Sequence, residues 1–246
     1  MSILERFGRR VRMRHSPIEF TVQIWHRNEK RIIGTGFIFQ PEGKILTCAH
    51  VVCNASEEKI VTVGTKVRVR FRREKAVSVD KIEYEAKVIQ HFHKLHEGRY
   101  YDDIVVLELI NAPESLIDRK KMARLEPAYN PDENFDSRGN NFQSYGYSPV
   151  GVFASKYAKG IINGPVEGPL ELTLCANPLE LTSNEIERGM SGAAVIDLKR
   201  DRVVGLITHK LETSSESGIS NKAYGADMKI VLLPEVTCNQ LESAQV

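Results

Sequence analysis

One serine stands in a turn that could present its hydroxyl to a substrate. Ser191 lies between two glycines in Gly189-Met190-Ser191-Gly192, and the small apolar segment Ala193-Ala194-Val195 follows it. Glycine lets the backbone adopt conformations that other residues resist, so the hydroxyl and nearby backbone N–H groups could face one site. This arrangement suits acyl transfer by a nucleophilic serine. Because Gly-x-Ser-Gly is also an ordinary turn before a strand, the motif needs partners elsewhere in the chain.

A serine hydroxyl becomes a good nucleophile when a base takes its proton and a carboxylate orients that base. His50 is the candidate base, because it follows Ile45-Leu46-Thr47-Cys48-Ala49, where a strand is predicted to end in small residues. Asp103 is the candidate acid, because it directly precedes an apolar run and an acid at the edge of a buried strand needs a polar partner. Asp102 is the competing acid.

Histidines and cysteines raise the question of a metal site. His91, His93 and His96 stand two and five residues apart in a polar segment, but no Cys or carboxylate pattern accompanies them. We interpret them as exposed loop histidines and predict neither a metal nor a cofactor. The four cysteines are too few and too unevenly spaced for a disulfide framework, and they contain no Cys-x-x-Cys pair. We expect reduced thiols at all four positions, which are Cys48, Cys53, Cys175 and Cys238.

The composition is that of a soluble globular protein. The chain has 246 residues, of which 41% are hydrophobic and 27% charged, and it is long enough for one large domain or two small ones. Its net charge of +2 is too mild to imply a nucleic-acid partner. No apolar run approaches membrane-spanning length, and the N-terminus lacks the apolar region of a secretory signal. We therefore expect a cytoplasmic protein.

Two basic segments keep a nucleic-acid alternative open. Residues 1–14 could form a short basic amphipathic helix, and residues 66–72 alternate basic and apolar side chains with a period of two. We interpret the first as an arm that docks on the body and the second as a strand with one solvated face. The sequence has no interleaved aromatic platform on which bases could stack.

Short runs separated by turn residues dominate the rest of the chain, which predicts an all-β protein of two barrels or sandwiches. Strands are expected at 20–26, 31–39, 44–47, 66–72, 84–90, 104–109, 141–147, 152–162, 170–174, 193–197, 203–209 and 223–228, with a short helix at 114–122. The chain then divides into five segments. These are a basic arm at 1–17, an N-terminal barrel with the His and Asp at 18–112, a connector at 113–140, a C-terminal barrel with the Ser at 141–236 and a tail at 237–246.

Four blocks in this order resemble the chymotrypsin-like serine peptidases, and most closely their bacterial trypsin-like and HtrA-like members. The blocks are Gly34-Thr35-Gly36-Phe37-Ile38, Thr47-Cys48-Ala49-His50-Val51-Val52, Asp103-Ile104-Val105-Val106-Leu107 and Gly189-Met190-Ser191-Gly192. Residues 203–207 and 225–227 resemble the two strands that follow the nucleophile in that family. The order His, Asp, Ser is that of the chymotrypsin template. The resemblance spans about residues 18 to 233 and implies two six-stranded antiparallel β-barrels with the active site between them.

The resemblance implies a serine endopeptidase that cleaves a protein or peptide substrate through an acyl-enzyme. It assigns His50 as the general base, Asp103 as its orienting partner and Ser191 as the nucleophile. The backbone N–H groups of Gly189 and Ser191 would form the oxyanion hole, worth about 3 kcal/mol each.

The same resemblance places substrate-binding residues. Glu185, six residues before Ser191, would lie at the base of the pocket for the residue before the scissile bond. Thr208, His209 and Lys210 would form the edge strand that pairs with the substrate backbone. A carboxylate at the pocket base would favour Lys or Arg in the substrate, and Glu187 or Asp227 could supply that charge instead.

The chain departs from the family pattern at Met190. Secreted trypsin-like enzymes have an aspartate there, which pairs with a newly cleaved N-terminus, and methionine cannot accept that ammonium. We therefore predict control by loops, by a regulatory protein or by a fused sensor domain. The alternative function is a catalytically silent peptidase-like domain used for binding or as a scaffold.

Overall fold

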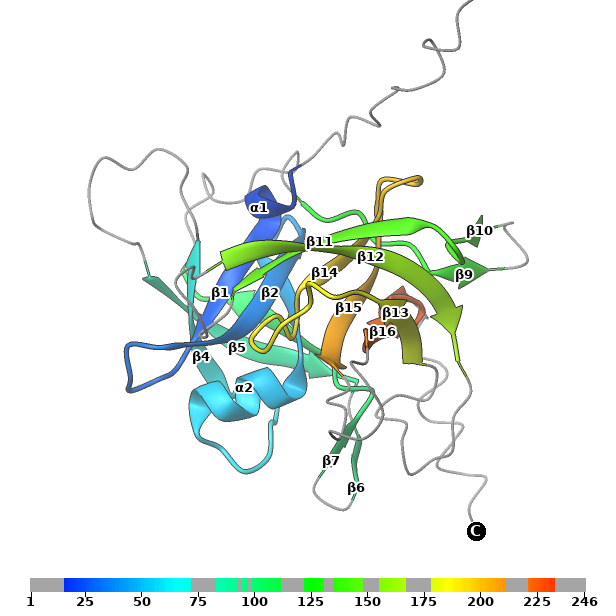
Figure 1. The fold of residues 1–246 in the computed structure, drawn as a ribbon. Helices are drawn as coiled ribbons and strands as arrows, with labels where there is room; N and C mark the ends of the chain where they lie inside the picture. The colour runs from blue at the N-terminus through cyan, green and yellow to red at the C-terminus, as the bar shows by residue number, and fades with distance from the viewer. Residues whose placement is uncertain are drawn as a thin grey trace, which may run out of the picture.

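The computed structural model describes residues 16–71, 83–92, 94–96, 99–111, 122–130, 135–147, 155–166, 178–210 and 221–232. Within these residues most of the chain is organised as two closed, six-stranded antiparallel β-barrels (Figure 1). The strand order is β1-β2-β3-β8-β5-β4 in the first barrel and β11-β12-β13-β16-β15-β14 in the second. The prediction of an all-β protein with two six-stranded barrels is confirmed.

The first barrel is built from strands whose inward side chains are apolar. Val67 and Val69 of β4 are buried, whereas Arg68 and Arg70 point outward and pair with Glu83 of β5. The alternating basic segment is therefore a strand with one face in the core and a charged outer face that is matched by acids on its neighbour. The strands and helices are α1 Pro17–Phe20, β1 Thr21–Trp25, β2 Ile32–Gln40, β3 Lys44–Thr47, α2 Ala49–Ser56, β4 Lys66–Phe71, β5 Glu83–His91 and β8 Val105–Leu109.

The second barrel closes around its own apolar core, in which Phe142, Leu179 and Leu181 are fully buried. Its strands are β11 Asn141–Tyr147, β12 Ser155–Pro165, β13 Pro178–Thr182, β14 Ala194–Asp197, β15 Arg202–Lys210 and β16 Lys222–Asp227, and α3 Lys229–Leu232 follows. A two-stranded sheet of β9 Tyr129–Asn130 and β10 Phe135–Asp136 precedes it.

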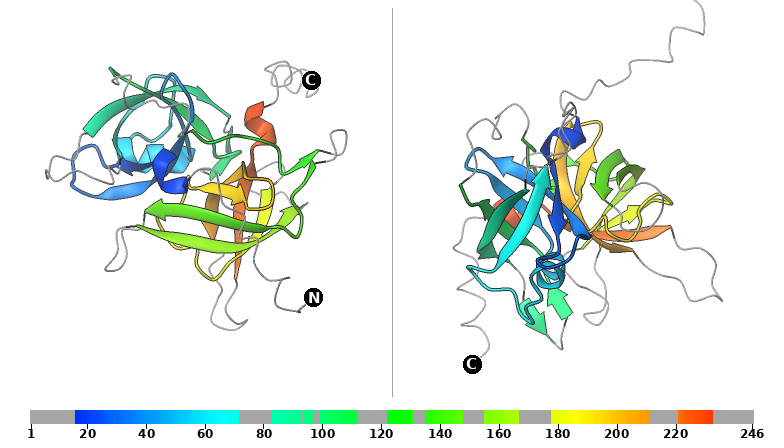
Figure 2. Two further views of the ribbon diagram at one scale, coloured as in Figure 1. Left: turned by 90° about the horizontal axis from the view of Figure 1, so that it is seen from above. Right: turned by 90° about the vertical axis from the view of Figure 1, so that its left-hand side faces the viewer.

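The barrels share apolar surface. The core of the first barrel continues into Ala194, Ile196, Val203 and Leu206 on β14 and β15 of the second. Figure 2 shows the blue and cyan strands of the first barrel beside the green, yellow and orange strands of the second. Because protein interiors are close-packed, this shared core fixes the two barrels against each other, and with them any site between them.

Several elements were not predicted. Helix α2 follows directly on β3, and β13 was not expected. The histidine segment 91–96 was expected as a loop, but its residues Lys94–His96 form β6, which pairs with β7 Arg99–Tyr101. Strands of three to five residues carry too little periodicity to stand out in a sequence. The expected strand at 170–174, most of the expected helix at 114–122, the N-terminal arm up to residue 15 and the tail lie outside the described residues.

None of the helices in the described part has the length and apolar character needed to cross a membrane.

Candidate active site

Two neighbouring strands bring His50 and Asp103 together. Thr47, the last residue of β3, is paired with Val105, the first residue of β8. His50 lies three residues after one end of this pair and Asp103 two residues before the other, so both reach the same rim of the barrel. The Asp103 carboxylate accepts hydrogen bonds from the backbone N–H of His50 at 2.9 Å and from its Nδ1. Backbone pairing thus sets the geometry of this pair.

The Asp103 carboxylate also caps the N-terminal end of helix α2. His50 is the second residue of α2, and Cys48 at the N-cap makes no side-chain cap. Asp103 supplies the missing acceptor at this end of the helix, where a negative charge is favourable. Its side chain is 6% exposed, against 34% for His50, so the imidazole faces outward from a buried acid.

Asp103 controls the charge of the imidazole. Burial of His50 lowers its pKa, but the negative charge of Asp103 and the hydrogen bond to it raise the pKa by more, and the result lies above the ordinary 6.5. The neighbouring Asp102 has a backbone φ of 48° and makes no such contact with His50. Of the two acids considered, Asp103 is the one that faces the histidine.

Ser191 is held on the opposite barrel but is fastened to the first. The backbone N–H of Thr35 on β2 donates to the Ser191 carbonyl at 2.9 Å, and the Thr35 hydroxyl donates to the Gly189 carbonyl at 3.2 Å. The same hydroxyl accepts from the backbone N–H of Tyr147 at 3.0 Å. Thr35 is fully buried. Its side chain therefore links the first barrel to the second and to the segment around Ser191, residues 185–192, which we call the serine turn.

The glycines of the serine turn are required by their conformation. Gly189 and Gly192 have φ values of 92° and 85°, in the left-handed region that side chains disfavour. A Cβ on Gly192 would stand 1.9 Å from the Thr35 carbonyl oxygen. In the described part of the chain the backbone N–H groups of Gly189 and Ser191 donate to no protein acceptor. Both therefore have the hydrogen-bonding capacity that an oxyanion hole needs.

The Ser191 hydroxyl donates to the backbone carbonyl of Thr208 on β15 at 3.0 Å. The structure contains no hydrogen bond between Ser191 and His50. In structures without bound substrate, catalytic hydrogen bonds are often long or absent and tighten only when substrate binds.

Met190 fills apolar space beneath the serine. It is fully buried and its side chain would lie 3.1 Å from a Cβ added to Gly146, within the core of the second barrel. A charged N-terminus could enter this apolar surrounding only at a large desolvation cost.

The predicted substrate-binding residues occupy two sides of the serine turn. Glu185 is exposed and its carboxylate accepts from the backbone N–H of Lys159 on β12 at 2.8 Å. Glu187 forms an ion pair with Lys156 of the same strand. Asp227 accepts from the backbone N–H groups of Ala128 and Lys229, and burial raises its pKa even though these hydrogen bonds lower it. The substrate contacts of these three acids stay predictions.

Strand β15 carries the other predicted contacts. Thr208, whose backbone carbonyl accepts the hydrogen bond from the Ser191 hydroxyl, lies at a break in register between β15 and β16. Burial lowers the pKa of His209; of its two charged neighbours, Asp103 raises the pKa and His50 lowers it further. Lys210 crosses to the serine turn, where its Nζ donates to the Ile186 carbonyl at 3.2 Å.

One group of described residues has the composition of a metal site. Ligand atoms of Cys48, His50 and Asp103 lie within 4.8 Å of one another. A metal there would have to displace the hydrogen bond between His50 and Asp103, because that bond uses Nδ1 of the imidazole. The Cys48 thiol donates to the Ile207 carbonyl at 3.4 Å. Cys48 is buried and Cys53 is half-buried.

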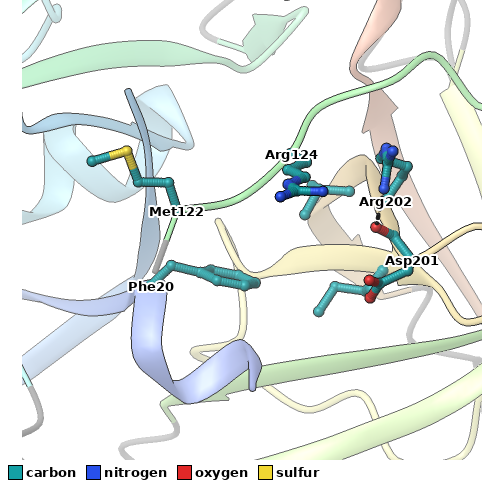
Figure 3. A pocket seen from close by; sticks show the side chains of 7 residues that line it. Phe20, Met122, Arg124, Asp201 and Arg202 are labelled. Atoms are coloured by element: carbon teal, nitrogen blue, oxygen red, sulfur yellow. Dashed lines mark hydrogen bonds between the residues drawn. The ribbon is translucent and has the colours of Figure 1, made fainter. Parts of the chain in front are cut away.

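A pocket lies away from these residues, where α1 and the connector meet the second barrel (Figure 3). Its empty volume is about 270 Å³, open solvent included. Phe20 and Met122 form one end, and Arg124, Asp201 and Arg202 form the other. None of the residues proposed from the sequence lines it, so it is separate from the candidate active site.

Sequence reasoning missed two contacts. No contact is predicted for Thr35 from the sequence, although a polar β-branched residue within an apolar strand signals a buried hydrogen bond. No sequence pattern signals the hydrogen bond from Lys210 to the Ile186 carbonyl, because this bond depends on how the fold brings together two segments 24 residues apart.

The fold and this residue arrangement define a class: two-barrel proteins with a His–Asp pair on one barrel and a glycine-flanked serine on the other. The model of the trypsin-like peptidase domain matches residues 34–206, and the chain belongs to this family. A comparison with curated proteins finds no match.

Solved structures share the fold at low sequence identity. An HtrA-type protease AlgW with a tripeptide has a TM-score of 0.59 and 20% identity, over 95% of this chain and 63% of that one. The AlgW structure with a decapeptide has a TM-score of 0.56 and 17% identity, over 87% of this chain and 60% of that one. This chain thus spans less than two thirds of those proteins.

Proposed function

We propose that this protein is a serine endopeptidase that hydrolyses peptide bonds through an acyl-enzyme. His50 takes the proton of the Ser191 hydroxyl, Asp103 holds the imidazole in the required tautomer, and the backbone N–H groups of Gly189 and Ser191 stabilise the oxyanion. The observation that carries the proposal is the doubly hydrogen-bonded contact of Asp103 with His50. Because this contact uses Nδ1 of the imidazole, the outer nitrogen of the ring stays available to accept the proton of the Ser191 hydroxyl.

Control by a partner or an attached domain is part of the proposal. The serine hydroxyl rests on the Thr208 carbonyl, and the apolar burial of Met190 argues against activation by an inserted N-terminal ammonium. A ligand or partner that shifts β15 could release the hydroxyl toward His50. An effector or processing protease of a reducing, cytoplasmic compartment fits this chemistry.

The second candidate function is a catalytically silent scaffold. It is favoured by the same contact between Ser191 and Thr208, because a hydroxyl committed to a carbonyl is not poised for attack. The two functions differ in whether the serine can react at all.

Labelling with a fluorophosphonate followed by mass spectrometry separates them. An active serine gives an adduct on Ser191 that is absent in Ser191→Ala and strongly reduced in His50→Ala. The matched control is His91→Ala, which removes an exposed histidine at the end of β5 and should label like the native protein. Absence of an adduct with every partner and condition tried would support the scaffold.

A further inference from the structure

The charges around the serine turn are divided between its two sides. On the β12 side, Glu185 accepts from the backbone of Lys159 and Glu187 pairs with Lys156. On the β15 side, the Lys210 ammonium donates to the backbone carbonyl of Ile186 at 3.2 Å. Glu185 and Glu187 thus both bond to residues of β12. The Lys210 ammonium lies on the other side, where Ser191 contacts β15.

This cation has no acidic partner within the described residues. By contrast, Lys156 pairs with Glu187, and Lys222 on β16 pairs with Glu180 at 2.9 Å. Lys210 is half-buried and an ammonium has three N–H donors. One is used by Ile186, which leaves two that could bind another acceptor.

Lys210 lies on the strand that the Ser191 hydroxyl contacts. Ser191 contacts the carbonyl of Thr208, and Lys210 is two residues further along the same strand, about 7 Å at the usual rise of a strand. Its side chain then returns to the carbonyl of Ile186, five residues before the serine. A residue whose carbonyl carbon stands at Ser191 would extend its own side chain into the space between these two points.

We infer that Lys210 selects substrates with Asp or Glu as the residue that supplies the scissile carbonyl. A carboxylate would receive the two remaining ammonium donors in charge-assisted hydrogen bonds, which are stronger than neutral ones. A basic side chain would meet a like charge instead. The inference rests on the proposed function and opposes the basic preference that a carboxylate of Glu185 would confer.

The test uses peptidyl diphenyl phosphonates, which react with an active serine and need no identified substrate. Three probes of one peptide sequence carry a glutamate-like, a glutamine-like or a lysine-like side chain next to phosphorus. The second-order rate of adduct formation on Ser191 is measured by mass spectrometry. We expect the acidic probe to react about tenfold or more faster than the amide probe, the factor typical of one hydrogen bond to a charged group.

Variants assign the preference to one cation. Lys210→Ala should abolish the acid-over-amide ratio, and Lys210→Glu should make the lysine probe the fastest. Lys66→Ala, on the exposed face of β4, should keep the native ratio. The inference is overturned if the native protein prefers the lysine or amide probe, or if the acid preference persists in Lys210→Ala.

Labelling with the fluorophosphonate distinguishes a failure of the Lys210 inference from a failure of the proposed peptidase function. A native protein that takes this small, side-chain-free label on Ser191 but discriminates against the acidic probe refutes the role of Lys210 and leaves the peptidase intact. A protein that takes neither label with every partner and condition tried overturns both.

Discussion

Replacing Asp103 by Asn tests the pair on which the proposed chemistry depends. The two carboxylate oxygens accept from the backbone N–H of His50, at 2.9 Å, and from its Nδ1. An amide has only one acceptor oxygen. If that oxygen stays on the backbone N–H, the amide NH₂ faces Nδ1 and forces the ring proton onto the outer nitrogen, which can then no longer accept from Ser191.

The expected loss is large because the wrong tautomer removes the base. In the chymotrypsin template the equivalent change costs about 10⁴ in turnover, which corresponds to about 5 kcal/mol of barrier. We expect a loss of about this size in the rate of fluorophosphonate labelling of Ser191. The folded state should persist, because the residue keeps its shape and one hydrogen bond.

The pH dependence gives an independent readout. The labelling rate of the native protein should rise as His50 loses its proton, at a pH above the ordinary pKa of 6.5, because Asp103 raises the pKa more than burial lowers it. In Asp103→Asn the charge is gone and burial remains, so the pKa of His50 should fall. Imidazole NMR signals can follow this shift even where labelling is slow.

Asp102→Asn is the matched control. Asp102 has a φ of 48°, a conformation that Asn tolerates well, so the change should leave labelling within about a factor of three, close to the usual spread of neutral surface changes. Labelling of Asp103→Asn within tenfold of the native rate, or an equal loss in Asp102→Asn, would refute the assignment of the acid.

Three further outcomes follow from the packing and hydrogen bonds of the two barrels. Thr35→Val should lower the free energy of unfolding by about 2–4 kcal/mol, because it removes the two buried hydrogen bonds that the Thr35 hydroxyl makes with the Gly189 carbonyl and the Tyr147 N–H; urea titration checks this, and equal stability of Thr35→Val and Thr35→Ser would contradict it. Gly192→Ala should cost more than about 4 kcal/mol, since its Cβ would stand 1.9 Å from a backbone oxygen at a φ of 85°; a folded variant with native melting temperature would contradict the turn geometry. Burial raises the pKa of Asp227 against the opposing hydrogen bonds, so stability from this group is full below the unfolded pKa and is lost as pH rises through the folded pKa. Asp227→Asn should therefore gain melting temperature relative to the native protein as pH increases, and a constant difference from acidic to neutral pH would speak against a raised pKa.

The sequence alone determined the fold class and the order of the chemical groups. Alternating strands such as residues 66–71 specify which face is buried, because side chains in a strand alternate between its two faces. The glycines beside Ser191 signalled a special backbone, and they have positive φ. His50, Asp103 and Ser191 could be selected because each residue stood at the end of an apolar run or in a glycine turn.

Only the tertiary structure decided what those residues contact. The pairing of Thr47 with Val105 is what aims Asp103 rather than Asp102 at His50, and no local pattern distinguishes two adjacent acids. The direction of Glu185 toward β12 and of Lys210 toward Ile186 likewise depends on how barrel closure places distant segments. Charge preference in a site is set by such long-range placement, whereas strand formation and glycine turns are set by the local chain.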